Sequence, residues 1–135
     1  MKKLLAALSA VLLLLTVCSC GGNTTNAVII SVKSDIYTDE DIDAAIKTAM
    51  NYFRREFSGC TLKEIRYTGD GARERFDELA RQYHADSAII LLSTFEVGPS
   101  GGDGSLNPNS TYENWQWILV REANGGWKHA THGYG

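Results

Sequence analysis

The clearest pattern along the chain is an apolar stripe at helical spacing between residues 42 and 57. Thr38 precedes it as a candidate N-cap, and the acidic run over 39–41 suits the positive end of a helix dipole. The apolar positions recur every three or four residues, on one helical face; they are Ile42, Ala45, Ile46, Ala49, Met50, Phe53 and Phe57. Gly59 is the candidate C′ residue. The pattern predicts an amphipathic helix from Thr38 to Gly59 whose apolar face is core.

A second, shorter stripe predicts another helix over residues 72–83. Gly69-Asp70-Gly71 precedes it as a turn. Its apolar positions are Ala72, Phe76, Leu79, Ala80 and Tyr83. The opposite face is charged and carries an Asp77–Arg81 pair at helical spacing, so we interpret it as solvent-exposed surface.

Runs of β-branched and apolar residues predict five strands, over residues 27–32, 61–67, 88–97, 115–120 and 127–131. The run 88–92 is apolar at every position, which predicts a central strand covered on both faces. Leu62 and Ile65 break the alternation of their strand, which predicts a bulge or a later strand start. Asn124-Gly125-Gly126 predicts the turn of a hairpin between the last two strands.

The predicted order is strand, helix, strand, helix and three strands, which indicates an α+β fold. With 135 residues, the chain is long enough for one domain rather than two. We place this single domain over residues 27–135.

The first nineteen residues have the layout of a secretory signal. Lys2 and Lys3 precede an apolar run of about 14 residues, shorter than the roughly 20 needed to span a bilayer. Val17-Cys18-Ser19-Cys20 resembles a bacterial lipobox. The resemblance implies a lipoprotein signal peptide over 1–19 and a diacylglyceryl thioether on Cys20. The alternative is ordinary secretion with cleavage near Gly22 and no anchor.

Lipidation of Cys20 implies an address for the domain. It would be held at the extracytoplasmic face of the cell membrane through a short polar linker over residues 20–26, and two acyl chains suffice for stable anchoring. The formal net charge of −3 offers no general electrostatic footprint for nucleic acid, so we expect no nucleic-acid partner.

A long polar, glycine-rich segment over residues 98–111 separates two predicted strands. Loops of this length in compact domains are functional or disordered, so it is a candidate binding loop; the alternative is a plain hairpin connection. Asp103, Asn107 and Asn109 could offer oxygen ligands to Ca²⁺. Only Asp103 is charged within the loop and the EF-hand spacing is absent, so we expect neither a metal nor a cofactor.

Aromatic residues of the last two strands form the second candidate site. Trp117, Trp127 and His129 are expected on a common face of the sheet, with Tyr67 or Tyr112 nearby. Such a group would make an aromatic pocket with one titratable side chain. The alternative is a packed core that contains one hydrogen-bonded histidine.

The remaining candidates for chemistry offer little. His129 and His132 are three residues apart, which on a regular strand places them on opposite faces and prevents them from sharing a metal. Cys60 has no neighbouring histidine or basic cluster to lower its pKa, so we interpret it as a buried apolar residue. Neither HExxH nor CxxC occurs in the chain, and we assign no catalytic residue.

Several stretches resemble a group of uncharacterised bacterial lipoproteins of Gram-positive type. They lie within residues 37–62, 101–112 and 114–128. The resemblance implies a cone-shaped α+β fold, similar to the nuclear-transport-factor-2-like (NTF2-like) or cystatin-like folds, in which two helices pack on a curved, mainly antiparallel sheet. No activity is established for the group, so the resemblance implies no site residue.

Three hypotheses about function follow. The first is a non-enzymatic, membrane-anchored binding module that uses the loop 98–112 and the nearby aromatic faces to hold a protein, a peptide or a cell-wall fragment. The second is a small-molecule enzyme with a cone pocket in which His129 is the general acid or base. The third is a structural lipoprotein that associates with a second copy of itself.

Overall fold

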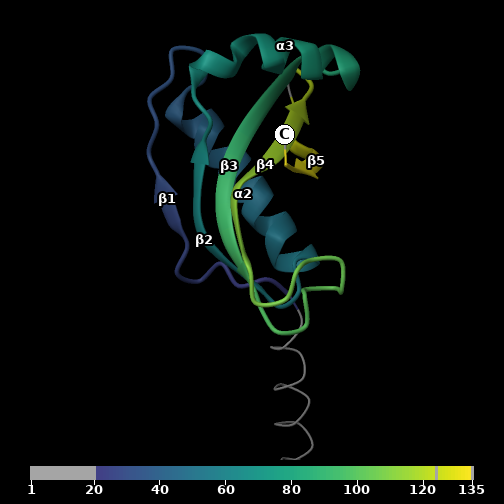
Figure 1. Ribbon diagram of the computed structural model, residues 1–135. Helices are drawn as coiled ribbons and strands as arrows, with labels where there is room; N and C mark the ends of the chain where they lie inside the picture. Colours follow the sequence, from purple (N-terminus) through teal and green to yellow (C-terminus); the bar gives the residue numbers. More distant parts are fainter. Residues whose placement is uncertain (1–20, 124, 135) are drawn as a thin grey trace, which may run out of the picture.

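The computed structural model describes residues 21–123 and 125–134. The predicted signal peptide over 1–19 and the lipidation site Cys20 lie outside the described residues, as does Asn124 of the predicted turn. The described part is one α+β domain (Figure 1). Its elements are β1 (Val28–Ile30), α2 (Asp39–Glu56), β2 (Cys60–Tyr67), a 3₁₀ turn (Asp70–Ala72), α3 (Arg73–Gln82), β3 (Ser87–Val97), β4 (Thr111–Arg121) and β5 (Lys128–Gly133).

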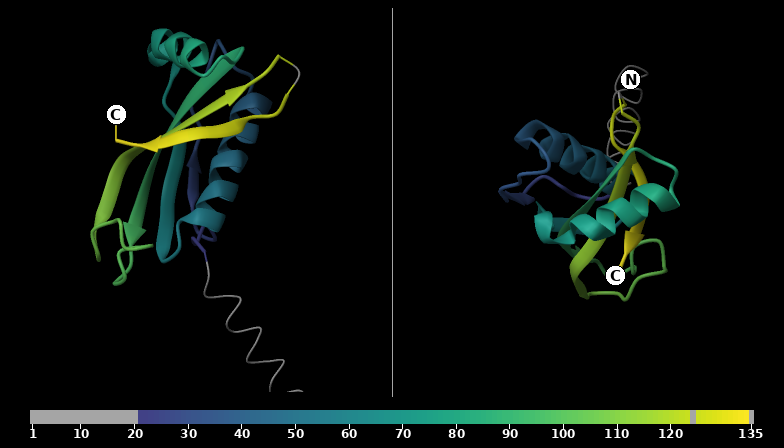
Figure 2. Two further views of the ribbon diagram at one scale, coloured as in Figure 1. Left: turned by 90° about the vertical axis from the view of Figure 1, so that its right-hand side faces the viewer. Right: turned by 90° about the horizontal axis from the view of Figure 1, so that it is seen from above.

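The five strands form one open, curved sheet in the order β1-β2-β3-β4-β5. β1 runs parallel to β2, and the other three pairs are antiparallel, so the predicted mainly antiparallel sheet is confirmed. β3 is the middle strand, as its unbroken apolar run predicted. α2 lies along one face of the sheet, and α3 crosses the end at which β3 begins (Figures 1 and 2).

The predicted apolar stripe of α2 is the centre of the core. Ile42, Ala45, Ile46, Ala49 and Phe53 are all buried, while the charged positions of the helix face solvent. α2 packs against β2, β4 and β5, and such packing of an amphipathic face supplies most of the stability of helices in proteins.

The ends of α2 are fixed in different ways. At the start, the Thr38 hydroxyl accepts a hydrogen bond from the Asp41 amide, and the Asp41 carboxylate accepts one from the Thr38 amide. At the other end, the C-cap is Phe57, so Gly59 lies one residue beyond the C′ position that the sequence predicted for it. Phe57 leaves helical geometry after Glu56, and Gly59 adopts a φ of +75° that turns the chain directly into β2.

The register shifts once in each of the three antiparallel strand pairs, and two of these shifts bear on the predictions from the sequence. The register between β2 and β3 shifts between Leu62 and Glu64, which confirms the predicted irregularity. A second shift occurs in β5, where Ile118 pairs with Thr131 but Leu119 pairs with His129. The extra residue between these partners is Ala130, and it reverses the alternation of side chains along β5.

The β5 bulge overturns the expectation for the two histidines. His129 and His132 lie opposite Leu119 and Trp117, which share a face of β4, so both rings point to the same side of the sheet. Their nitrogens, Nε2 of His129 and Nδ1 of His132, are 3.0 Å apart. The prediction of opposite faces is wrong because it assumed a regular strand.

The described helices include none that is long and apolar enough to cross a membrane.

Candidate functional site

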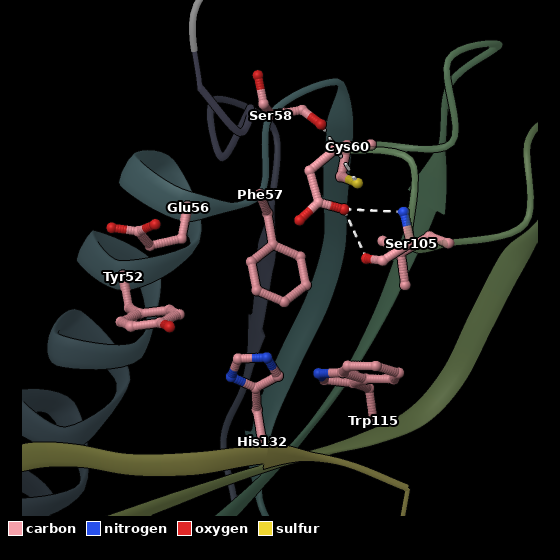
Figure 3. A pocket seen from close by; sticks show the side chains of 11 residues that line it. Tyr52, Glu56, Phe57, Ser58, Cys60, Ser105, Trp115 and His132 are labelled. Atoms are coloured by element: carbon pink, nitrogen blue, oxygen red, sulfur yellow. Dashed lines mark hydrogen bonds between the residues drawn. The ribbon is translucent and has the colours of Figure 1, made fainter.

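A pocket of about 210 Å³ opens at the end of the domain where α2 finishes (Figure 3). Its walls come from the last turn of α2, the turn into β2, the loop over residues 98–110, and the strands β4 and β5. The lining residues are Tyr52, Glu56, Phe57, Ser58, Cys60, Gly102, Asp103, Ser105, Leu106, Trp115 and His132.

Aromatic rings form one side of this pocket. Phe57 is central, with its ring centroid 5.1 Å from that of His132, 6.3 Å from that of Trp115 and 6.4 Å from that of Tyr52. All three neighbours stand at steep angles to the Phe57 ring, the edge-to-face geometry that aromatic pairs prefer. The wall is therefore held by ring–ring contacts from one helix and two strands.

The indole N–H of Trp115 lies in this wall without a hydrogen-bond partner. Its Nε1 atom is buried, and no acceptor among the described residues reaches it. The neighbouring Trp117, which is 1% exposed, donates its N–H to the Ser93 hydroxyl over 2.8 Å. Buried donors are nearly always paired, and an unpaired one costs about 1–3 kcal/mol.

Two histidines form a neutral pair, with His132 in the aromatic wall and His129 behind it. The His129 ring stacks on Tyr52 with centroids 3.8 Å apart, and its Nε2 faces Nδ1 of His132. Burial, together with the charge of His132 and Arg55, lowers the pKa of His129 to about 4. Burial also lowers the pKa of His132. Both rings are therefore neutral at neutral pH, and one nitrogen donates to the other.

The polar loop over residues 98–110 forms the opposite wall and is tied to the helix–strand turn. The amide of Gly98 donates to the carbonyl of Gly59 over 3.0 Å. The Asp103 carboxylate accepts hydrogen bonds from the amide and hydroxyl of Ser105, which lower its pKa. Gly101 has a φ of +71°, and a Cβ there would meet the Leu106 carbonyl oxygen at 2.5 Å. The loop is therefore folded back on itself.

Cys60 lies at the inner end of the pocket but is poorly placed for nucleophilic chemistry. The residue is 2% exposed, and burial together with the Asp103 charge raises the pKa of its thiol. The Phe57 ring lies between Cys60 and His132 (Figure 3). The thiol is thus protonated at neutral pH and has no imidazole beside it.

No family model, curated protein or solved structure matches the chain. The site is therefore interpreted from its own geometry. Among the described residues, no group of three or more His, Cys, Asp or Glu side chains is arranged to hold a metal ion.

The candidate loop residues separate in the structure. Asp103 lines the pocket, whereas Asn107 and Asn109 are exposed and do not line it. Tyr112 packs beside the pocket: its ring stacks on Phe95 with centroids 5.2 Å apart, and its hydroxyl accepts from the Asn107 amide over 3.1 Å. Tyr112 therefore supports the loop and does not line the pocket.

The candidate aromatic group is also divided. The ring centroids of Trp117 and His129 are 5.9 Å apart, but both rings lie behind the pocket wall. Trp127 is at the opposite end of α2, where its indole N–H donates to the Asp41 carbonyl over 2.9 Å. Tyr67 lies nearer Trp127, since both rings contact Tyr37.

The residues that sequence reasoning missed are Tyr52, Glu56, Ser58, Trp115 and His132. Trp115 could have been found, because it alternates with Trp117 and so shares the face of the candidate site. His132 could not, because the bulge that turns it inward has no clear mark in the sequence.

Proposed function

We propose that the protein is a lipid-anchored, extracytoplasmic and non-enzymatic binding module whose ligand enters the pocket at the end of α2. The observation that carries this proposal is the buried, unpaired indole N–H of Trp115 in the pocket wall. A ligand that supplies an acceptor there relieves a desolvation cost that the domain alone bears. The hydrogen-bonded loop keeps most of the pocket preformed, and an acceptor reaches the buried Nε1 atom when a neighbouring side chain moves aside.

The chemistry of the lining favours binding over catalysis. The thiol of Cys60 is protonated and separated from His132 by Phe57, and the His132 ring is neutral. The rival enzyme hypothesis uses His129, but that ring stacks on Tyr52 and faces His132 instead of the pocket.

The first described residues lie at the pocket end of the domain. Residue 20 directly precedes Gly21, and the following residues are tied to the pocket's own elements. The amide of Gly22 donates to the Arg54 carbonyl, and that of Asn23 donates to the Cys60 carbonyl. A diacylglyceryl group on Cys20 would therefore hold the pocket end of the domain towards the membrane.

The anchor is tested by mass spectrometry and fractionation of cells that produce the full chain. We expect the mature protein to begin at Cys20, to carry the diacylglyceryl mass and to sediment with membranes. The Cys20→Ala chain should lose the lipid mass. A wild-type product without lipid that washes into the medium would overturn the proposed location.

The pocket is tested by NMR on the mature chain beginning at residue 20 with Cys20→Ala and ¹⁵N label. The described residues include three tryptophans, each with an indole N–H signal, and the Trp115 signal is assigned by its loss in Trp115→Phe. Cell-envelope extract should shift this signal and leave that of Trp127, at the far end of α2, unchanged. Equal shifts of all three signals, or none, would contradict the proposal.

A further inference from the structure

We infer that the ligand of this pocket is a small organic cation, an aliphatic ammonium group with a hydrogen-bond acceptor close to it. The inference rests on the proposed binding function and adds the chemical class of the ligand. Three independent features of the lining support it: the balance of charge, the position of one carboxylate, and the aromatic wall with its unpaired donor.

The lining carries negative charge without a compensating cation. Glu56 and Asp103 both line the pocket, and its described lining contains no lysine or arginine. Hydrogen bonds from Ser105 lower the pKa of Asp103 and keep it ionised, while burial keeps His132 neutral. An open site of this composition attracts cations and repels anions.

The position of Glu56 is unfavourable for the helix that carries it. It is the last residue of α2, where the helix macrodipole is negative and a carboxylate costs about 0.3–1 kcal/mol. Arg54 and Arg55 in the same turn have the favourable charge. Glu56 makes no hydrogen bond or ion pair with another described residue that would offset this cost. Its carboxylate therefore serves the pocket better than it serves the fold.

The aromatic wall matches a cation, and the indole N–H adds a second requirement. Tyr52 and Phe57 contribute aromatic surface to the lining near Glu56, and Trp115 contributes aromatic surface on the far side of the pocket (Figure 3). Ring faces attract ammonium groups, most strongly where water is excluded. An ammonium group cannot accept the N–H of Trp115, so the same ligand must also carry an oxygen or another acceptor.

The size of the pocket limits the ligand. Sites for drug-sized molecules usually occupy about 300–1,000 Å³, and this pocket has about 210 Å³. It therefore holds one small group, such as a free amino alcohol or the ammonium headgroup of a lipid. Both sources share the ammonium-plus-oxygen chemistry, and the proximity of the pocket to residue 21 makes the headgroup a source to be tested.

The decisive experiment titrates the Cys20→Ala mature chain with choline and with 3,3-dimethylbutan-1-ol, its neutral isostere, and follows the Trp115 indole signal. Choline should shift the signal, and the neutral alcohol should bind at least about tenfold more weakly. Glu56→Gln and Asp103→Asn should each weaken choline binding by about two- to fivefold. Glu40→Gln, at the other end of α2, is the matched control and should leave choline binding unchanged.

The outcomes separate this inference from the proposed function. Equal binding of choline and the neutral alcohol would overturn the cation inference while leaving a binding pocket. The same holds if envelope extract shifts the Trp115 signal but choline does not. If neither extract nor choline shifts it, the proposed function itself fails.

A vesicle arm identifies the source of the cation. Binding of the same chain to phosphatidylcholine vesicles, reversed by free choline, would assign the site to a lipid headgroup. Binding of choline without vesicle binding would assign it to a soluble ligand, and either result supports a cationic ligand. Binding to phosphatidylglycerol vesicles alone would overturn it, because that headgroup is anionic.

Discussion

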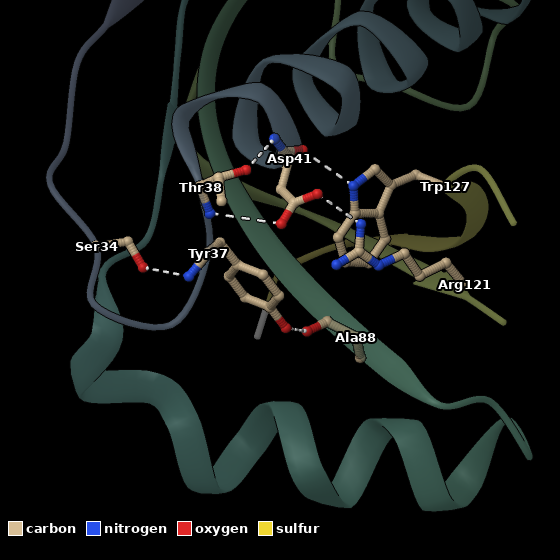
Figure 4. Close-up of polar contacts among 7 residues, drawn as sticks. All are labelled: Ser34, Tyr37, Thr38, Asp41, Ala88, Arg121 and Trp127. Carbon is tan, nitrogen blue, oxygen red and sulfur yellow. Dashed lines mark hydrogen bonds and ion pairs between the residues drawn. The ribbon is translucent and has the colours of Figure 1, made fainter. Parts of the chain in front are cut away.

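The two ends of α2 are built from similar side chains but differ in how their polar groups are paired. At the first end, Asp41 joins the neighbouring elements (Figure 4). Its carboxylate accepts from Arg121 over 2.8 Å, and its carbonyl accepts from the Trp127 indole over 2.9 Å. The Arg121 guanidinium also lies 4.2 Å from the centroid of the Trp127 ring. This end is saturated with partners, so it stabilises the fold.

The last turn of α2 is the opposite case. Beside this turn, Trp115 of β4 has a buried N–H without a partner. The acidic residue of the turn, Glu56, lies at the negative end of the helix dipole. Two neutral histidines take the place of the arginine found at the first end. Unpaired donors and misplaced charges are features that a fold does not need, and for this reason we propose this end as the site of function.

The largest effect on stability is expected at Phe53, on the buried face of α2. Phe53 is 0% exposed and packs against Phe57, Phe95 and Trp117. Phe53→Ala should lower the free energy of unfolding by about 3–5 kcal/mol. Lys47→Ala, on the exposed face of the helix, should change it by less than about 0.5 kcal/mol. Similar losses in urea unfolding for both variants would show that the buried face is misassigned.

A matched pair of tryptophan substitutions tests the difference between the ends directly. Trp127→Phe removes the hydrogen bond to Asp41 and weakens the contact with Arg121, whereas Trp115→Phe removes an N–H that has no partner. Both lose the same number of atoms. Trp127→Phe should therefore cost about 1 kcal/mol more in the free energy of unfolding. Equal costs in chemical denaturation would mean that the Trp115 N–H is paired in solution.

The two ends should also lose stability in different ranges of pH. The pKa of His129 is lowered to about 4, whereas an unfolded histidine has a pKa of about 6.5, so the unfolded chain takes up the proton first. The contribution of neutral His129 to the free energy of unfolding is complete above about pH 6.5. It is lost as the pH falls towards 4, and the loss is roughly 1 kcal/mol after discounting for partial exposure. The Arg121 hydrogen bond lowers the pKa of Asp41 below 3.8, so its contribution is lost only in more acidic solution.

Unfolding measured from pH 7 to pH 3 checks these two ranges. His129→Gln should reduce the change in the free energy of unfolding between pH 6.5 and 4. Asp41→Asn should reduce only the change that occurs in more acidic solution. If His129→Gln leaves the profile above pH 4 unaltered, the ring does not titrate as described.

The smallest effect concerns the two glutamates at opposite ends of the same helix. Glu56→Gln should raise the free energy of unfolding by about 0.3 kcal/mol, because it removes a carboxylate from the negative end of the dipole. Glu40→Gln, in the first turn, should lower it by a similar amount. Thermal unfolding of the two variants at low salt provides the measurement. A destabilisation above about 1 kcal/mol by Glu56→Gln would give that carboxylate a structural role.

The helices and the central strand could be predicted because their signals are local. The apolar spacing from Ile42 to Phe53 reports which face of a helix can be buried, and the unbroken run of β3 reports burial on both faces. The boundaries were less accurate where side chains from distant elements intervene. α2 ends at Glu56, since Phe57 turns towards Trp115 and His132 from the far end of the chain.

The candidate site could be predicted only in part. Asp103 was identified from the composition of its loop, and the alternation of Trp115 with Trp117 in the sequence agrees with the face of β4 on which Trp115 lies. His132 was assigned to the wrong face because one inserted residue, Ala130, changes the register of β5. Trp127 was expected on the same face as Trp117. It lies instead beside Asp41 at the first end of α2, whereas Trp117 contacts Phe53 near the other end.

By itself, the sequence determined the α+β class, the two amphipathic helices, the buried middle strand and the polar loop, because each follows from the periodicity of neighbouring residues. It also supplied the pattern on which the proposed lipid anchor at Cys20 rests. Only the tertiary structure decided which aromatic residues meet, which histidines face one another and which indole N–H is left unpaired. These depend on strand register and on contacts between residues far apart in the chain, and no local pattern encodes them.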